Sequence, residues 1–233
     1  MKQLTLLIVL VLFTAVHSHA QSAFKGVGIF GALTESAHYY SNPDKSGYAV
    51  YPPNHASKEY FNWGAGAFLE LGRDRLRWQT ELEYTHTGAL EKELLDPITG
   101  LRSSSFTANK YTYVQWNNYL KFYYPLGYAH WYFMPGVRLE YLLNNKVTAF
   151  TDFSGNFPKF WFSGDLALGY EFPLFKKFSL FAEYHWNPDV IWHKHDNVSM
   201  RSKTLELRVG IVMRPRKRAI DDCNAPVYKG PAY

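Results

Sequence analysis

The chain has 233 residues, of which 18% are aromatic and 19% are charged, and its formal net charge is +5. This charge is too small to indicate nucleic-acid binding, and the single cysteine, Cys223, excludes an intramolecular disulfide framework. The length suits one domain. The many tyrosines and tryptophans are typical of membrane–water interfaces, where the ring lies in the apolar layer and its polar atom stays hydrated.

Residues 1–20 have the pattern of a secretory signal peptide. Lys2 provides a basic start, residues 4–16 are mostly apolar, and Ala20 completes a small-x-Ala motif, after which we expect cleavage. The apolar run is shorter than the ~20 residues that a membrane-spanning helix needs. No other stretch of the sequence is apolar over such a length. If the mature protein lies in a membrane, strands must therefore cross it.

The chain beyond the signal peptide alternates between apolar and polar residues. In residues 76–87, for example, Trp78 and Leu82 share one face while Glu81 and Glu83 share the other. A period of two residues predicts a β-strand with one apolar and one polar face. The same pattern predicts eight strands, at residues 25–34, 60–71, 76–87, 109–124, 129–142, 159–172, 178–186 and 203–214.

Short and long connections alternate strictly between these strands. The short ones are residues 72–75, 125–128 and 173–177, and the long ones are residues 35–59, 88–108, 143–158 and 187–202. Together with the aromatic, apolar outer faces, this order predicts an all-β fold, an eight-stranded antiparallel up-and-down transmembrane β-barrel over residues 21–214. Both ends of the barrel and the short turns would face the periplasm. A soluble β-sandwich is the alternative, but it would not need an apolar outer face on nearly every strand.

Several single residues carry local expectations. Gly26 and Gly28 share the inner face of the first strand, where small residues would leave room for bulky neighbours. Asn118 interrupts the outer face of the fourth strand, which predicts a bulge or a register change there. Pro135 lies in the middle of the fifth strand, where it cannot donate a hydrogen bond, so we expect a local bulge or break.

An eight-stranded barrel is just wide enough for side chains to fill it, whereas a general diffusion pore needs roughly sixteen strands. Buried charges are tolerated only when they are paired. The sequence therefore predicts a charge network inside the barrel, with Arg138 beside Asp165 and Arg208 beside Glu183. The predicted members near mid-height are Glu81, Glu83, Arg138, Asp165, Glu183, Glu206 and Arg208.

An enzyme that acts on lipid A is a more specific alternative. Small outer-membrane barrels with this activity use a histidine with a serine and a carboxylate. The candidates would be His185, Ser163, and Glu183 or Asp165. However, the strand of His185 contains no nearby partner serine, and all these residues face inward rather than toward lipid. We therefore predict no catalytic residues and no cofactor.

Two further segments have weaker signals. His193 and His195 could bind a metal ion, but Lys194 lies between them and no second pair is near, so a solvated loop and no metal site are expected. Residues 215–233 continue past the last strand as a periplasmic tail. This tail is either disordered or a docking peptide for an envelope protein, and Cys223 could form an intermolecular bond.

The chain resembles the PorT-like group of small outer-membrane barrels of the Bacteroidota over nearly its whole length. The resemblance rests on the signal ending at Ala20 and Gln21, the glycine-rich stretch at residues 25–31, and the final strand at residues 205–211. It implies no catalytic residues, and it implies support of protein secretion as one possibility.

From these patterns we expect a non-enzymatic protein of the cell outer membrane. Its role would be structural, adhesive or that of an accessory subunit in an envelope complex, and the alternatives are a lipid A-modifying enzyme or a small-solute channel. The expected partners are outer-membrane lipid or lipopolysaccharide and an envelope protein bound through the C-terminal tail, without nucleic acid.

Overall fold

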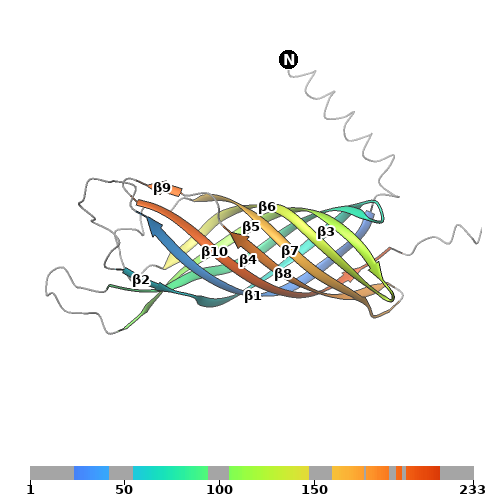
Figure 1. Ribbon diagram of the computed structural model, residues 1–233, viewed down its shortest axis with the longest axis horizontal. Helices are drawn as coiled ribbons and strands as arrows, with labels where there is room; N and C mark the ends of the chain where they lie inside the picture. The colour runs from blue at the N-terminus through green and yellow to red at the C-terminus, as the bar shows by residue number, and fades with distance from the viewer. Residues whose placement is uncertain are drawn as a thin grey trace, which may run out of the picture.

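The computed structural model describes residues 24–41, 55–93, 105–146, 159–175, 177–188, 193–195 and 198–215. Within these residues, eight long antiparallel strands close into a barrel, which confirms the predicted fold class (Figure 1). The strands are β1 (Phe24–Ser41), β3 (Tyr60–Gly72), β4 (Leu76–Glu93), β5 (Thr107–Leu126), β6 (Ala129–Lys146), β7 (Phe160–Pro173), β8 (Phe178–Pro188) and β10 (Val198–Met213). Each pairs with its neighbour along the chain, and β1 closes the barrel by pairing with β10.

Two short strands extend the wall beyond this ring. β2 (His55–Lys58) pairs with β4, and β9 (His193–His195) pairs with β10. The described residues contain no helix that is long and apolar enough to cross a membrane. The predicted signal peptide and residues 216–233 of the predicted tail lie outside the described residues.

The two ends of the barrel differ in their connections. The β3–β4, β5–β6 and β7–β8 turns lie at one end, together with the start of β1 and the end of β10 (right in Figure 1). Gly72 and Gly127, in the first two of these turns, have φ angles of 131° and 62°, which glycine adopts more easily than any other residue. The long connections all leave from the opposite end.

The strands continue further toward the long connections than the sequence predicts. β1 runs to Ser41 instead of residue 34, β4 runs to Glu93 instead of residue 87, and β10 already begins at Val198. Apolar alternation marks a strand only where one face meets an apolar phase. These extensions keep their backbone pairing where that alternation is absent, so the pattern makes the strands too short at this end.

The predicted irregularity at Asn118 is wrong. Asn118 pairs in register with Thr80 on β4 and Val137 on β6, because a polar side chain on the outer face leaves the backbone ladder unchanged. The register shift between β5 and β6 lies instead between Thr112 and Tyr113, nearer the long connections.

Pro135 interrupts pairing without a bulge. The β5–β6 pairs stop at Tyr119 with Gly136 and resume at Phe122 with Phe133, in the same register. On its other side, Pro135 still pairs with a residue of β7. The predicted break is therefore present and the bulge is not, as expected when only the donor is missing.

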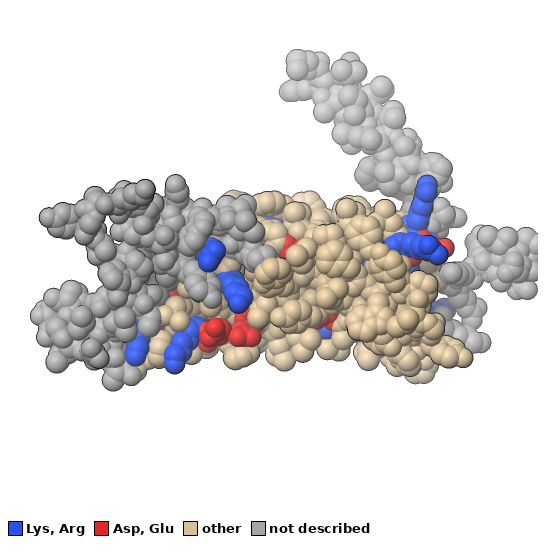
Figure 2. Space-filling model, in the orientation of Figure 1, with Lys and Arg blue, Asp and Glu red and all other residues tan. Residues whose placement is uncertain are grey.

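The outer surface carries large apolar side chains along the strands. On β6, Trp131, Val137 and Tyr141 are each 40–48% exposed, and Figure 2 shows few charges in the middle of the visible face. Aromatic rings meet across strands at both margins, with 5.0 Å between ring centroids for Trp131 and Tyr170 and for Tyr141 and Phe160. Ten residues of tilted strand between Trp131 and Tyr141 span about 25 Å, the height of the apolar band of an outer-membrane barrel. We call this surface the apolar belt.

Inside the barrel, bulky aromatic rings pack over glycines of the neighbouring strand. A side chain at Gly169 would collide with the ring of Tyr132, and one at Gly28 with the ring of Phe68. Each of these glycines is the direct cross-strand partner of its aromatic residue. The same arrangement holds for Gly66 with Phe30, Gly136 with Tyr119, and Gly210 with Phe181. The expectation that small residues make room inside the barrel is confirmed.

Candidate functional site: the charge network inside the barrel

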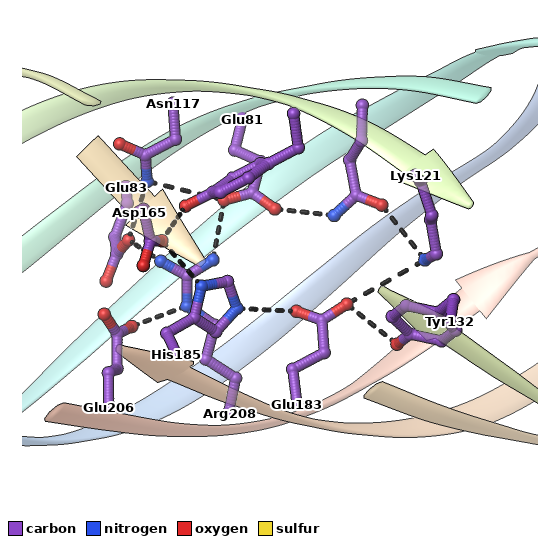
Figure 3. Close-up of polar contacts among 12 residues, drawn as sticks. Glu81, Glu83, Asn117, Lys121, Tyr132, Asp165, Glu183, His185, Glu206 and Arg208 are labelled. Carbon is purple, nitrogen blue, oxygen red and sulfur yellow. Dashed lines mark hydrogen bonds and ion pairs between the residues drawn. The ribbon is translucent and has the colours of Figure 1, made fainter. Parts of the chain in front are cut away.

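The strand alternation turns one set of charged side chains into the lumen. Each of the seven residues predicted from the sequence is 2% exposed or less. They come from five strands: Glu81 and Glu83 from β4, Arg138 from β6, Asp165 from β7, Glu183 from β8, and Glu206 and Arg208 from β10. Because facing strands contribute opposite charges, their side chains meet across the interior (Figure 3).

Arg208 binds three carboxylates at once. Its guanidinium group donates to Glu81 Oε2, Glu83 Oε2 and Glu206 Oε1, each at 2.6 Å. The expected pairing with Glu183 is wrong, although the two residues are backbone partners. A planar guanidinium with several donors is best satisfied by several acceptors, and the carboxylate of Glu183 is bound by other groups.

Arg138 extends the network to the other side of the lumen. Its Nε donates to Asp165 Oδ2 at 2.9 Å, and its Nη2 donates to Glu206 Oε2 at 3.1 Å. Nη2 also forms an ion pair with Asp165 Oδ2 at 2.7 Å. Arg138 therefore lies beside Asp165, as expected, and Glu206 bridges the two arginines. Asn117 adds hydrogen bonds to the carboxylates of β4.

His185 lies between two carboxylates. Its Nδ1 is 2.8 Å from Asp165 Oδ2, and its Nε2 is 3.1 Å from Glu183 Oε2. Both ring nitrogens are thus occupied, and the hydroxyl of Ser163 accepts a hydrogen bond from Asn187 at 2.9 Å instead. The serine, histidine and carboxylate considered for lipid A chemistry are all in the lumen, but the contacts of His185 do not include the serine.

The network continues toward the short-turn end through Lys121 (Figure 3). Its Nζ donates to Glu70 Oε1 at 2.8 Å and to Gln79 Oε1 at 3.1 Å, and it lies 3.6 Å from the centre of the Tyr132 ring. The hydroxyl of Tyr132 donates to Glu183 Oε1 at 2.8 Å. Lys121 and Glu70 face inward as the alternation predicts, but the sequence did not include them in the mid-height group.

Arg214 closes the network at the short-turn end. It binds the carboxylates of Glu70 and Glu171, and Glu171 also accepts a hydrogen bond from the hydroxyl of Tyr123. Glu70 additionally binds Arg77 at 3.0 Å. Ion pairs thus continue from mid-height to the short-turn end of the barrel.

A small pocket that is partly open to solvent lies at the long-connection end. It is lined by Tyr113, Glu140, Trp161, Asn187 and Thr204, among others. In the described part of the chain, no group of three or more His, Cys, Asp or Glu side chains could hold a metal ion. The side chains of His193 and His195 are outside the described residues, and so is Asp196.

No protein-family model matches the chain, and no curated protein sequence matches it significantly. Solved structures do match it. Outer membrane protein OprG from Pseudomonas aeruginosa has a TM-score of 0.49 at 10% identity, with 84% of this chain and 99% of OprG covered. Neisserial surface protein A has a TM-score of 0.43 at 11% identity, with 80% of this chain and 97% of that protein covered. Ail, the attachment invasion locus protein of Yersinia pestis, has a TM-score of 0.38 at 14% identity, with 82% of this chain and 99% of Ail covered.

Proposed function

We propose that the protein is a non-enzymatic β-barrel of the outer membrane whose blocked lumen makes it a scaffold for surface-exposed segments rather than a channel. The observation that carries this proposal is the contrast between the two faces of its strands. The outer face is apolar over about 25 Å, and the inner face is filled by ion pairs.

The apolar belt supports the membrane location. Burying a large apolar side chain removes it from water at a gain of about 1.5–3 kcal/mol, and here such side chains point outward on every strand of the barrel. Exposed apolar patches of this size are typical of a surface that meets lipid or another protein. The aromatic rings at both margins favour lipid, because such rings gather at the two interfaces of a bilayer.

The charge network argues against a channel. Arg208 and Arg138 link carboxylates from three strands across the lumen, so a solute passing through would have to break several buried ion pairs. Breaking one buried pair costs about 3–5 kcal/mol. The network thus serves as a plug that also fixes the barrel shape.

The long strand extensions support an external role. β4, β5 and β6 have 18, 20 and 18 residues, whereas crossing a membrane takes about 9–11 residues. The excess lies at the end from which the long connections leave. Rigid strands would hold these connections above the membrane, as an adhesive or structural surface protein requires.

Conductance measurements test this proposal. The full chain, inserted into a planar lipid bilayer, is expected to give no unitary current steps, whereas a sixteen-stranded porin in the same bilayer gives large ones. Insertion is verified by heat-dependent migration in gels and by protection of the barrel from protease in vesicles. Stepwise ion conduction by the inserted protein would contradict the plug, and failure to insert would contradict the membrane location.

The accessory-subunit role is tested separately. The resemblance to PorT-like barrels suggests a secretion or envelope complex, and the tail would provide the contact. Gently solubilised membranes are compared for the full chain and for a chain that stops after Arg214. Envelope proteins that co-purify only with the full chain would support this role, and equal results for both chains would exclude a tail-mediated contact.

A further inference from the structure

Four lysines gather on the outer wall of the barrel, beyond the apolar belt at the long-connection end. Lys58 of β2, Lys92 of β4, Lys110 of β5 and Lys146 of β6 lie on strands that are consecutive neighbours in the sheet. Strand alternation places Lys92 and Lys110 on the same side as the apolar belt, and Lys58 lies there as the cross-strand partner of Leu90. The register shift beside Thr112 turns Lys146 to the same side, opposite Lys110. We call these residues the lysine patch. Lys58, Lys110 and Lys146 are exposed, and Lys92 is partly buried.

The pairing of these strands brings like charges together. Lys110 and Lys146 are direct cross-strand partners. Side chains in such positions have Cβ atoms about 4.5–5.5 Å apart, and like charges there destabilise a sheet. Among the described residues, none of the four lysines forms an ion pair with a carboxylate. The described barrel wall therefore provides no ion-paired carboxylate for these lysines, whereas an anion bound between them would provide the opposite charge.

Aromatic rings hold the ammonium groups near the wall. Lys58 Nζ and Lys92 Nζ lie 4.6 Å and 4.8 Å from the centre of the same Phe106 ring. Lys110 Nζ lies 5.5 Å from the centre of the Tyr60 ring. Contacts of this kind contribute about 0.5–1 kcal/mol at exposed sites. They keep the charges along the outer wall instead of letting them extend into solvent.

The height of the lysine patch matches the headgroup layer. Val114 pairs with Tyr141 at the margin of the apolar belt that faces the long connections. Lys110 lies four residues farther toward the long connections. Four residues of tilted strand correspond to about 10 Å. Long lysine side chains at such a position can reach back to the interface while their apolar stems cover the wall.

We propose that the lysine patch binds the phosphate groups of an outer-leaflet lipid. This inference rests on the proposed membrane location. A lipid is favoured over a soluble polyanion because the patch continues the lipid-facing wall instead of lining the mouth of the lumen. The acyl chains would lie on the apolar belt below, and the phosphates would lie between the ammonium groups.

Native mass spectrometry of the full chain in dodecyl maltoside micelles tests the proposal. The probes are bisphosphorylated lipid A and the same lipid without phosphates. The variant K110Q/K146Q removes the opposed pair, and K58Q/K92Q removes the pair on Phe106. The matched control, R73Q/R75Q, removes two exposed positive charges from the β3–β4 turn at the opposite end.

The wild-type protein and the control variant are expected to retain bisphosphorylated lipid A and to release the dephosphorylated lipid. Each lysine variant should bind the phosphorylated lipid about tenfold or more weakly, as expected from the attraction of single basic residues to anionic lipid surfaces. Equal retention by K110Q/K146Q and the control would overturn the proposal. Inorganic triphosphate is added as a soluble competitor, and displacement of the lipid at equimolar triphosphate would also overturn it.

The outcome is separable from that of the proposed function. Insertion into vesicles is measured on the same preparations, by heat-dependent migration and protease protection. A wild-type protein that inserts but shows no dependence on the lysines would contradict the lysine patch alone. A protein that does not insert would contradict the membrane location, whatever its lipid binding in micelles.

Discussion

Arg208 supplies one fixed positive charge where three carboxylates meet. Glu81, Glu83 and Glu206 lie at hydrogen-bond distance from its guanidinium group and are almost fully buried. Neither solvent nor screening ions reach these groups easily, so the removal of the arginine would leave several charges without compensation. Buried pairs are weakly stabilising as a whole, yet the loss of one partner is strongly destabilising.

We expect Arg208→Met to lower the free energy of unfolding by about 3–5 kcal/mol, because the carboxylates remain buried without their partner. Adding Glu81→Gln and Glu83→Gln to this variant should restore part of the loss, since both uncompensated charges are removed. Urea unfolding in detergent micelles, followed by tryptophan fluorescence, measures these differences. Arg73→Met in the exposed turn is the control, and a loss in Arg208→Met no larger than in this control would contradict the prediction.

Sequence alternation identifies which residues face the lumen but not which of them bind one another. It places Arg138, Asp165 and Arg208 inside, and the structure has all three there. It also suggested that backbone partners such as Arg208 and Glu183 would pair through their side chains. Strand tilt and long side chains shift real contacts by several residues along the lumen, which a register alone does not encode.

At the scale of the strand, a bulky inward ring fits where the residue opposite it on the neighbouring strand is glycine. The Tyr132 ring covers Gly169 of β7 and stacks on Tyr123 with centroids 5.5 Å apart, and its hydroxyl group donates a hydrogen bond to Glu183. A side chain on the glycine would push the ring away from both contacts. Gly164 lies on the same strand but faces outward, and a side chain there would meet nothing within 4 Å.

Gly169→Ala should therefore destabilise the barrel by about 1–3 kcal/mol, the usual effect of overpacking an interior. Gly164→Ala, on the same strand, should be neutral or slightly stabilising, because the added methyl group meets no protein atom. Thermal unfolding of both variants in micelles provides the comparison. Similar midpoints for the two variants would show that the interior has room for the methyl group.

The sequence predicts the number and order of the barrel strands better than it predicts the residues at which they end. Each of the eight barrel strands was expected from its alternation, and the tight turns at Gly72 and Gly127 were placed correctly. The sequence does not predict the ends of β1 and β4 near the long connections. Hydrophobic alternation is absent there, because neither face needs to be apolar, while the backbone hydrogen bonding continues. The lysine patch lies in this region, which explains why the sequence did not reveal it.

For the molecule as a whole, the polarity of an ordinary soluble domain is reversed. Ion pairs such as that between Arg138 and Glu206 lie in the interior, beside the inward aromatic rings, and large apolar side chains cover the outside. This arrangement is stable only if the surroundings of the outer face are apolar over the height of the belt. The depth of each outward residue within the belt should then determine how well it tolerates a charge.

Val137 lies near the middle of the apolar belt, between Trp131 and Tyr141 on β6. We expect Val137→Arg to destabilise the protein in lipid vesicles by about 2–4 kcal/mol, because a charge near the bilayer midplane must be desolvated. Leu143→Arg, on the same strand but beyond Tyr141, should cost only about 0–1 kcal/mol. Guanidinium unfolding in vesicles of one lipid composition measures both free energies. Small, equal effects at the two positions would mean that the outer face meets water, and the membrane location would then be wrong.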